Sequence, residues 1–403
     1  MQKNVKIAAI LVTSLFFLWG LSYGLLEVMN KNFQNHLGVT KANSGLLQAA
    51  YFGAYFIIAM PAAWVARRYS YKIGIIMGLA LYAIGALMII PASNSANFSL
   101  FLLAFFVLAC GLGSLETNAN PYMVKLGDPK NAAFRINTAQ SFNGVGQFIG
   151  PIVGGQLFLT LSHGNLDENM ANVQMVYVGI ACIVLAILLT FVAVKMPDGA
   201  SEEEDASASS SSQPSYYSLF AYKHFTKGVL AQFLYVAAQV GAGAFFINYA
   251  VEHYEGLKDD EAAYFLSVAL IAFMAGRILT TPVFKLFPAG KLLGFYSLIN
   301  AFLVILLYFG LGKASVYVLI AVFFFMSISF PTIFALALDS LPKESVKNAS
   351  SLLIMSIVGG ALMPWFMGFV GDNFGIAASF LTLAPCFLYV CYYGFLGSKV
   401  QKS

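Results

Sequence analysis

The sequence predicts an all-α polytopic membrane protein whose twelve transmembrane helices form two pseudo-symmetric halves of six. Three observations lead to this fold class: a strongly apolar composition, apolar segments of membrane-spanning length, and the spacing of those segments as six, a linker and six. Of the 403 residues, 59% are hydrophobic and 10% are charged. Soluble domains have about a quarter of their residues charged, so this composition excludes a fold that faces water on all sides.

The apolar segments are expected to be helices rather than the strands of a barrel. A chain that crosses lipid has to satisfy its backbone hydrogen bonds internally, and only helices and closed barrels do so. Barrel strands alternate apolar and polar residues over about ten positions. The apolar runs here are continuous over about 20 residues, which is the length of a helix that crosses the hydrocarbon layer.

The expected spans fall into two groups separated by a polar segment. Their first residues are Ile7, Ser44, Ile73, Phe98, Thr138 and Val173, followed by Lys227, Glu261, Lys291, Ser315, Ala349 and Ala377. Residues 198–215 are acidic, rich in serine and poor in apolar residues, a composition typical of disorder. We therefore expect an N-terminal half over 1–197, a cytoplasmic and partly disordered linker over 198–222, and a C-terminal half over 223–403.

Basic residues gather in one set of loops. The loops after spans two, four, eight and ten and the two ends of the chain hold most of them: Arg67, Arg68, Lys72, Lys125, Lys130, Arg135, Lys285, Lys291, Lys343 and Lys347, with Lys3, Lys6, Lys399 and Lys402 at the ends. Lys and Arg are enriched in cytoplasmic loops, so we expect both termini in the cytoplasm. Because these residues are spread over short loops rather than one patch, we expect no nucleic-acid partner.

Two acidic residues lie inside the expected spans. A charged side chain at the centre of a bilayer costs about 2.5–3.5 kcal/mol on insertion scales, so such residues usually have a function. Glu116, in span four, lies in the segment GLGSLETNANPY, and Glu27 lies in the outer half of span one. By contrast, Asp339, Asp372 and Glu252 lie at span ends, where water reaches them.

Each of the two acids has a functional and a structural interpretation. Burial favours the neutral form of a carboxyl, so Glu116 is suited to hold a proton until one side of the membrane wets it. Its structural alternative is a carboxylate bonded to a neighbouring helix. Glu27 is placed to accept hydrogen bonds from sugar hydroxyls, which are strong when the acceptor is charged. Its alternative is an acid at the outer rim that contacts water or Lys31.

Several uncharged side chains in the spans suit a polyol. Amides both donate and accept hydrogen bonds, and aromatic rings stack on the C–H face of a sugar. The candidates of these two kinds are Gln140, Asn143, Asn118 and Gln239, together with Trp19 and Tyr235. For each of them, hydrogen bonding or packing between helices is a competing explanation.

With these segments the chain resembles the fucose permease family, the L-fucose:proton symporters of the major facilitator superfamily. The resemblance covers nearly the whole chain apart from the linker, and it rests on SLFFLWGLSYGLLEVMNKNFQ, LLQAAYFGAYFIIAMPA, GLGSLETNANPY, AQSFNGVG, AQFLYVAAQVGAGAFFINYAVE and FPTIFALAL. It implies the major facilitator fold, a monomer in the cell inner membrane, and alternating access to a site between the two halves.

The resemblance also implies roles for individual residues. The family's span-four glutamate and span-one acid, implicated in proton coupling and sugar binding, correspond to Glu116 and Glu27, where Glu27 replaces an aspartate. Trp19 and Gln140 correspond to two residues of the family's pocket. In contrast, Gly24 stands where the family has an asparagine and Gly243 where it has an aromatic residue, and we expect both changes to reshape the pocket. Which monosaccharide is bound therefore stays open.

These observations together predict proton-coupled uptake of a monosaccharide, L-fucose or a related hexose. The proton is the coupling ion, and no cofactor or metal is expected. The alternative is proton-coupled efflux of a drug or metabolite, because Gly146-x3-Gly150-Pro151-x2-Gly154-Gly155 resembles a motif of drug antiporters. A membrane enzyme is disfavoured because the loops are short and the four histidines are scattered. A channel is disfavoured because neither half has a ring of repeated charges.

Overall fold

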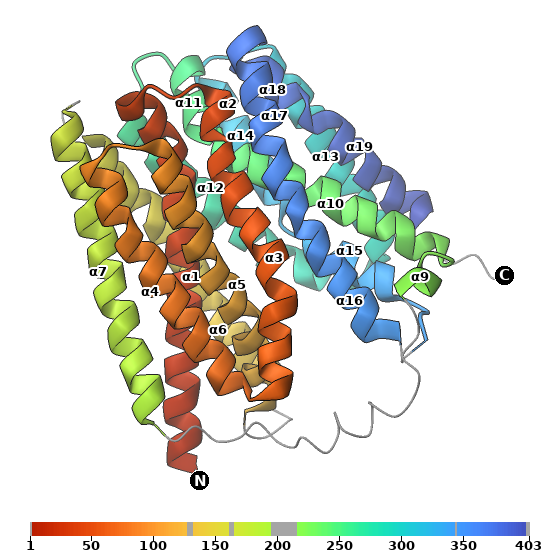
Figure 1. Ribbon diagram of the computed structural model, residues 1–403. Coiled ribbons are helices and arrows are strands. Elements are labelled where there is room, and N and C mark those ends of the chain that lie inside the picture. Colours follow the sequence, from red (N-terminus) through yellow and green to blue (C-terminus); the bar gives the residue numbers. More distant parts are fainter. Residues whose placement is uncertain (1, 127–131, 161–164, 195–215, 343–344, 400–403) are drawn as a thin grey trace. The chain divides into compact units, whose positions relative to one another are not determined.

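The computed structural model describes residues 2–126, 132–160, 165–194, 216–342 and 345–399 (Figure 1). Every regular element in these residues is a helix. The serine-rich segment expected to be disordered, 198–215, lies outside the described residues. By its internal contacts the chain divides into two compact units, Met1–Val39 with Ala49–Asp205, and Thr40–Gln48 with Ala206–Ser403.

The helices confirm the expected membrane-spanning architecture. Ten spans in the described residues are long and apolar enough to cross a membrane, and an eleventh is a helix pair bent by 51°. The span expected from Thr138 coincides with α6 (Ala132–Gly154), which is less apolar than those ten helices. Polar side chains such as Gln140, Asn143 and Gln147 lower its hydropathy. The number of helices agrees with twelve spans.

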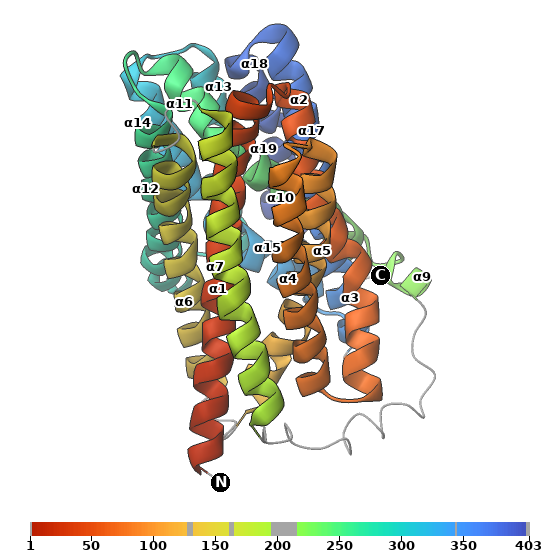
Figure 2. The ribbon, with the colours of Figure 1, turned by 60° about the vertical axis from the view of Figure 1, so that its left-hand side comes forward.

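The first unit is built from long helices. They are α1 (Gln2–Leu37), most of α3 (Leu46–Arg68), α4 (Tyr71–Asn94), α5 (Phe98–Lys125), α6 with its π-helical continuation η2 (Gly155–Thr160), and α7 (Leu166–Ala193). Within this unit α1 packs along α6, and α4 packs against both α5 and α7 (Figures 1 and 2). Side-chain oxygens begin three of these helices: Ser70 accepts from Ile73 N, Asn97 from Leu100 N, and Asn165 from Asp167 N.

Glycines allow α1 and α6 to approach closely. A Cβ atom at Gly24 would lie 2.6 Å from the Gln147 carbonyl oxygen and 3.0 Å from the Cα of Gly150. Gly146 meets the backbone of α1 in the same way. Small residues commonly permit such contacts between membrane helices. The span-five glycine motif therefore serves helix packing. The expectation that Gly24 shapes the pocket needs correction, because this position faces α6.

The second unit contains shorter and more often interrupted helices. Its first four spans comprise α10 (Lys223–Ala244) with α11 (Phe246–His253), α12 (Asp259–Thr280) with η3 (Thr281–Lys285), α13 (Ala289–Tyr308), and α14 (Lys313–Met326) with α15 (Ser329–Leu338). The last two comprise α16 (Val346–Met355), η5 (Ser356–Val358) and α17 (Gly359–Phe374), then α18 (Ile376–Leu381), α19 (Leu383–Tyr392) and η6 (Tyr393–Gly397). Two short helices, α2 (Lys41–Ser44) and α9 (Tyr216–Leu219), complete it.

Side chains support the interruption of span ten between α14 and α15. The Tyr235 hydroxyl donates to the Met326 carbonyl at 2.9 Å, and Arg277 Nε donates to the Ser327 carbonyl at 3.2 Å. Carbonyls freed by a helix break in lipid need such donors, because no bulk water is available there. These two carbonyls at the break are therefore hydrogen-bonded within the second unit.

The helix α2 docks on α17 within the second unit. The two carboxylate oxygens of Asp372 accept hydrogen bonds from the backbone N–H groups of Lys41 at 3.0 Å and Ala42 at 2.9 Å. A Cβ atom at Gly45 would lie 2.6 Å from the carbonyl carbon of Pro364, so the two helices touch through their backbones. Asp372, an acid at a span end, thus satisfies two otherwise free N–H groups.

Candidate functional site

Glu116 of α5 and Trp19 of α1 line one small cavity inside the first unit. Its volume is about 10 Å³, and the remaining walls are Leu15, Phe16, Leu112, Leu115 and Ala119. A polar site of about this size is the smallest that holds one water molecule. The structure therefore brings together two of the side chains that the sequence singled out, a carboxyl and an indole, in otherwise apolar surroundings.

Glu27 of α1 is buried more completely. Its side chain is 1% exposed, and neither carboxyl oxygen forms a hydrogen bond of normal geometry with any described residue. The Tyr23 side chain, one helical turn earlier, contributes a polar interaction. An ionised carboxylate buried without a full set of partners costs several kcal/mol, so this arrangement suits a carboxyl that is neutral in this state of the protein. The alternative of an acid open to water at the outer rim does not describe this state.

The amides of the first unit differ in what they contact. Asn143 is buried, donates to the Phe16 carbonyl at 3.1 Å and accepts from Gln147 at 2.7 Å, so its side chain links α6 to α1. Gln140 is exposed and donates to Asn120 Oδ1 at 3.4 Å. Gln140 is thus the more accessible of the two to a ligand.

Asn118 does not share the cavity of Glu116. Its Nδ2 donates to the Ser114 carbonyl at 2.7 Å, and its side chain lies against Gly74 of α4, where a Cβ atom would collide with it. Two positions along a helix correspond to about 200° of rotation, which explains why Asn118 and Glu116 face different neighbours.

Two candidates, Tyr235 and Gln239, lie one turn apart on α10 in the second unit. Tyr235 is buried, and its hydroxyl is already bonded to the Met326 carbonyl. Gln239 is half-buried. Gly243, a further turn along, is buried at the end of α10, just before the bend at Phe245.

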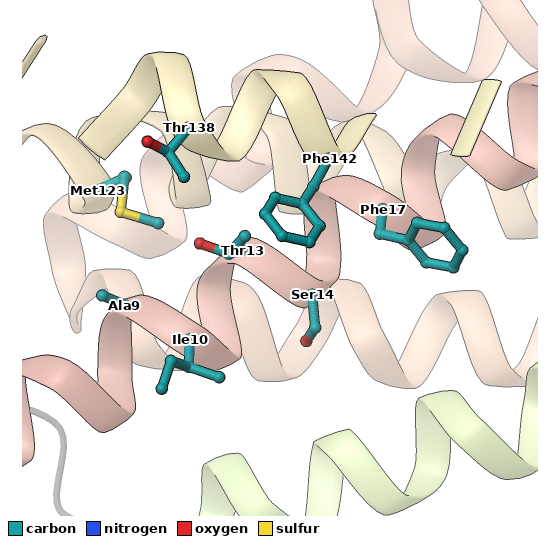
Figure 3. A pocket seen from close by; sticks show the side chains of 8 residues that line it. All are labelled: Ala9, Ile10, Thr13, Ser14, Phe17, Met123, Thr138 and Phe142. Carbon is teal, nitrogen blue, oxygen red and sulfur yellow. The ribbon is translucent and has the colours of Figure 1, made fainter. Parts of the chain in front are cut away.

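A larger hollow lies between α1, α5 and α6 of the first unit. Its volume is about 570 Å³, and its walls are Ala9, Ile10, Thr13, Ser14, Phe17, Met123, Thr138 and Phe142. Figure 3 shows Thr13 of α1 and Phe142 of α6 pointing towards each other across it. Small-molecule sites commonly measure about 300–1,000 Å³, so this hollow is large enough to admit a monosaccharide.

Most of this chain matches the model of one known protein family. The family model of the Major Facilitator Superfamily matches residues 9–358. The chain belongs to this superfamily. As a major facilitator protein it has relatives among curated sugar transporters. It is 36% identical over 403 residues to the L-fucose-proton symporter of Escherichia coli K12, covering 96% of this chain and 92% of the relative. It is 35% identical over 406 residues to a glucose/galactose transporter of Brucella abortus strain 2308, covering 99% and 96%.

Solved structures of other transporters share the fold of this major facilitator protein. The crystal structure of FucP in the outward conformation matches with a TM-score of 0.69 at 33% identity, over 98% of this chain and 100% of that one. A D-xylose-proton symporter matches with a TM-score of 0.75 at 13% identity, over 99% of each chain, which supports the fold. These relatives are transporters rather than enzymes.

This major facilitator protein also has a group of tyrosines near the two acids that the sequence did not single out. Tyr51 and Tyr55 lie on α3, and Tyr82 lies on α4 with its hydroxyl bonded to Ser22 of α1. Tyr51 interacts electrostatically with both Glu27 and Glu116. The sequence does contain a pattern that indicates this group: Tyr51 and Tyr55 are four positions apart, which places two hydroxyls on one face of an apolar span.

Proposed function

We propose that this protein takes up a monosaccharide together with a proton by alternating access. It would act as a monomer in the cell inner membrane with both termini in the cytoplasm. The observation that supports this most directly is the shared cavity of Glu116 and Trp19, which places a proton-binding group beside a ring suited to stack on a sugar. Its similarity to an L-fucose-proton symporter and to a glucose/galactose transporter supports the same function.

Glu116 is assigned the coupling proton. In the outward state the neutral carboxyl admits the sugar, and in the inward state water reaches the carboxyl and removes the proton to the cytoplasm. Glu27 contributes a second proton-binding group and an acceptor for sugar hydroxyls. Trp19 and Gln140 are assigned direct contacts with the sugar, because the indole lines the cavity and the Gln140 amide is exposed. Asn143, Asn118, Gln239 and Tyr235 are weaker candidates, since three of them are already bonded to backbone carbonyls.

The substrate is best sought among hexoses and 6-deoxyhexoses. Relatives named for L-fucose and for glucose and galactose match this chain at nearly equal identity, 36% and 35%. The test is uptake of radiolabelled L-fucose, D-galactose and D-glucose into proteoliposomes with an imposed pH gradient, acidic outside. We expect one of these sugars to accumulate above its external concentration. Equilibration without accumulation, for every sugar, would refute proton symport.

Efflux by proton antiport receives no support from the contacts of the span-five motif. Gly146 and Gly150 are occupied in packing against α1, and Gly154 contacts Val28. A motif that is explained by close helix packing does not specify the direction of transport. A panel of hydrophobic cations in the same vesicles tests the alternative, because an antiporter would expel them when protons enter.

A further inference from the structure

Two tyrosines of α3 form a stacked pair inside the first unit. The rings of Tyr51 and Tyr55 are 5.4 Å apart between centroids, with 27° between their planes. Tyr51 is 1% exposed, and both hydroxyl oxygens are buried without a hydrogen bond of normal geometry to any described residue. Buried tyrosine hydroxyls usually have a partner, and the polar group that each of these two hydroxyls interacts with by hydrogen bonding is the other one.

The pair lies between the helices that hold the two acids. On one side, the Tyr51 ring packs against the ring of Phe52 at 5.4 Å between centroids, and Phe52 in turn packs against the ring of Tyr23 of α1, one turn before Glu27, at 6.4 Å. On the other side, a Cβ atom at Gly113 of α5 would lie 3.4 Å from the Tyr55 ring, and Gly113 is three residues before Glu116.

Electrostatic interactions follow the same arrangement. Tyr51 lies within electrostatic range of both Glu27 and Glu116, and Tyr55 lies within electrostatic range of Glu116. The two hydroxyls also interact with each other. The stacked rings of α3 therefore lie between α5, which holds Glu116, and α1, which holds Glu27, within one unit.

We propose that Tyr51 and Tyr55 relay a proton between Glu116 and Glu27, so that the two carboxyls share one coupling proton during transport. This inference rests on the proposed proton symport. Once water has removed the Glu116 proton, the Glu27 proton bonds to the Tyr51 oxygen as the Tyr51 hydroxyl proton moves to Tyr55, and the Tyr55 proton moves to a carboxylate oxygen of Glu116. Each O–H bond that breaks is replaced by one that forms, both tyrosines end neutral, and the total charge is unchanged.

Water completes the relay where two groups are too far apart for direct transfer. The cavity beside Glu116 has a volume of about 10 Å³, which suffices for about one water molecule. A water molecule there can accept a proton from the carboxyl and donate one of its own to the next oxygen.

Other ionisable groups near the pair are distinguishable from it. Tyr82 interacts with both tyrosines, but its hydroxyl is engaged with Ser22 and the Leu18 carbonyl. Tyr177 of α7 also interacts with Tyr51 and is buried. Its hydroxyl has no hydrogen bond to a described residue, and its ring packs edge-on against Phe105 at 5.5 Å between centroids. No carboxyl is among the groups that interact with Tyr177. Tyr177 is therefore a matched control within the same unit.

Replacement by phenylalanine isolates the hydroxyl. The Tyr51→Phe and Tyr55→Phe variants keep both rings and their stack, and they break no hydrogen bond of normal geometry. We therefore expect both variants to fold and to melt within a few degrees of the wild type, as the Tyr177→Phe control does. A change in proton transfer can then be separated from a change in packing.

The experiment compares two modes of transport in proteoliposomes. Sugar counterflow at equal pH on both sides requires no net proton movement, whereas accumulation driven by an acidic exterior does. For Tyr51→Phe and Tyr55→Phe we expect accumulation to slow about tenfold, the size expected for loss of one hydrogen bond to a charged group, with counterflow within about twofold of the wild type. Tyr177→Phe should behave as wild type in both assays.

Three outcomes are informative, because they distinguish failure of the proposed symport from failure of the relay alone. If the wild type shows no gradient-driven accumulation, the proposed function fails. If the wild type accumulates sugar and the α3 variants match Tyr177→Phe, the relay fails alone. If accumulation and counterflow fall together, the pair supports structure or sugar binding, and the relay again fails. Should one of the two variants not fold, the other one tests the relay by the same comparison with Tyr177→Phe.

Discussion

Trp19 and Glu116 line the same small cavity of the first unit, although they come from the first and fourth membrane spans. Apolar walls surround the carboxyl there. A ligand that stacks on the indole would therefore exclude water from the carboxyl, and loss of the proton would depend on whether the cavity is filled. This relationship is the structural basis for the coupling that we propose.

Replacement of Glu116 by glutamine should separate sugar movement from proton movement. The amide keeps the size and neutrality of the protonated acid but cannot release a proton. We expect gradient-driven accumulation to fall at least about 100-fold, in line with the loss of a proton-transfer group, while counterflow persists. Radiolabelled uptake measures both. Glu168→Gln, at the start of α7, is the control, and equal losses in the two assays would count against the assignment.

Replacement of Trp19 by alanine should weaken sugar binding. Loss of the indole removes a large stacking surface, and aromatic contacts contribute about 0.5–1.5 kcal/mol beyond the area that they bury. We expect the KM for the transported sugar to rise about tenfold and Trp19→Phe to recover part of the loss. Trp64, which is 55% exposed, provides the control. An unchanged KM for Trp19→Ala would remove this residue from the binding site.

Replacement of Gly24 by alanine should destabilise the protein rather than alter its specificity. The new Cβ atom would lie 2.6 Å from the Gln147 carbonyl oxygen, and overpacking of this kind costs about 1–3 kcal/mol. A lower melting temperature of the purified variant in detergent checks this expectation. Gly179→Ala is the matched control, because no atom lies within 4 Å of its Cβ position and a helical alanine is favoured over glycine. Normal stability with a changed sugar preference would instead place Gly24 at the pocket.

Replacement of Asp372 by alanine should loosen α2. The variant loses the acceptor of two backbone N–H groups, those of Lys41 and Ala42, and loss of a helix cap costs about 1 kcal/mol. The amide hydrogens of residues 40–45, in and around α2, should exchange faster. Those of α17 should stay protected. Asn373→Ala, at the adjacent position, is the control. Unchanged exchange in this segment would show that backbone packing at Gly45 and Gly368 holds α2 without the carboxylate.

Most of the spans could be predicted because hydropathy is averaged over many residues and tolerates local irregularity, whereas the more polar α6 does not stand out by hydropathy. The interruption of span ten could not, because it depends on Tyr235 and Arg277 supplying donors from other helices. The packing role of Gly24 could not be predicted from the sequence either, because only the structure shows that a side chain at this position would collide with α6.

Part of the site could be predicted and part could not. Glu27 and Glu116 stand out in the sequence because charge is rare in membrane spans. Tyr51 and Tyr55 do not, because tyrosine counts as apolar and only the fold shows that both hydroxyls are buried. The separation of Asn118 from Glu116 was predictable, since two positions on a helix face different directions, although the two were grouped by their shared segment.

The direction of proton movement with sugar tests the central claim most directly. Sugar is added to a weakly buffered suspension of vesicles or cells that contain the protein, and the pH of the medium is recorded. We expect the transported sugar to cause immediate alkalinisation of the medium, which disappears with a protonophore and in Glu116→Gln. Acidification, or sugar entry with no change in pH, would contradict proton symport.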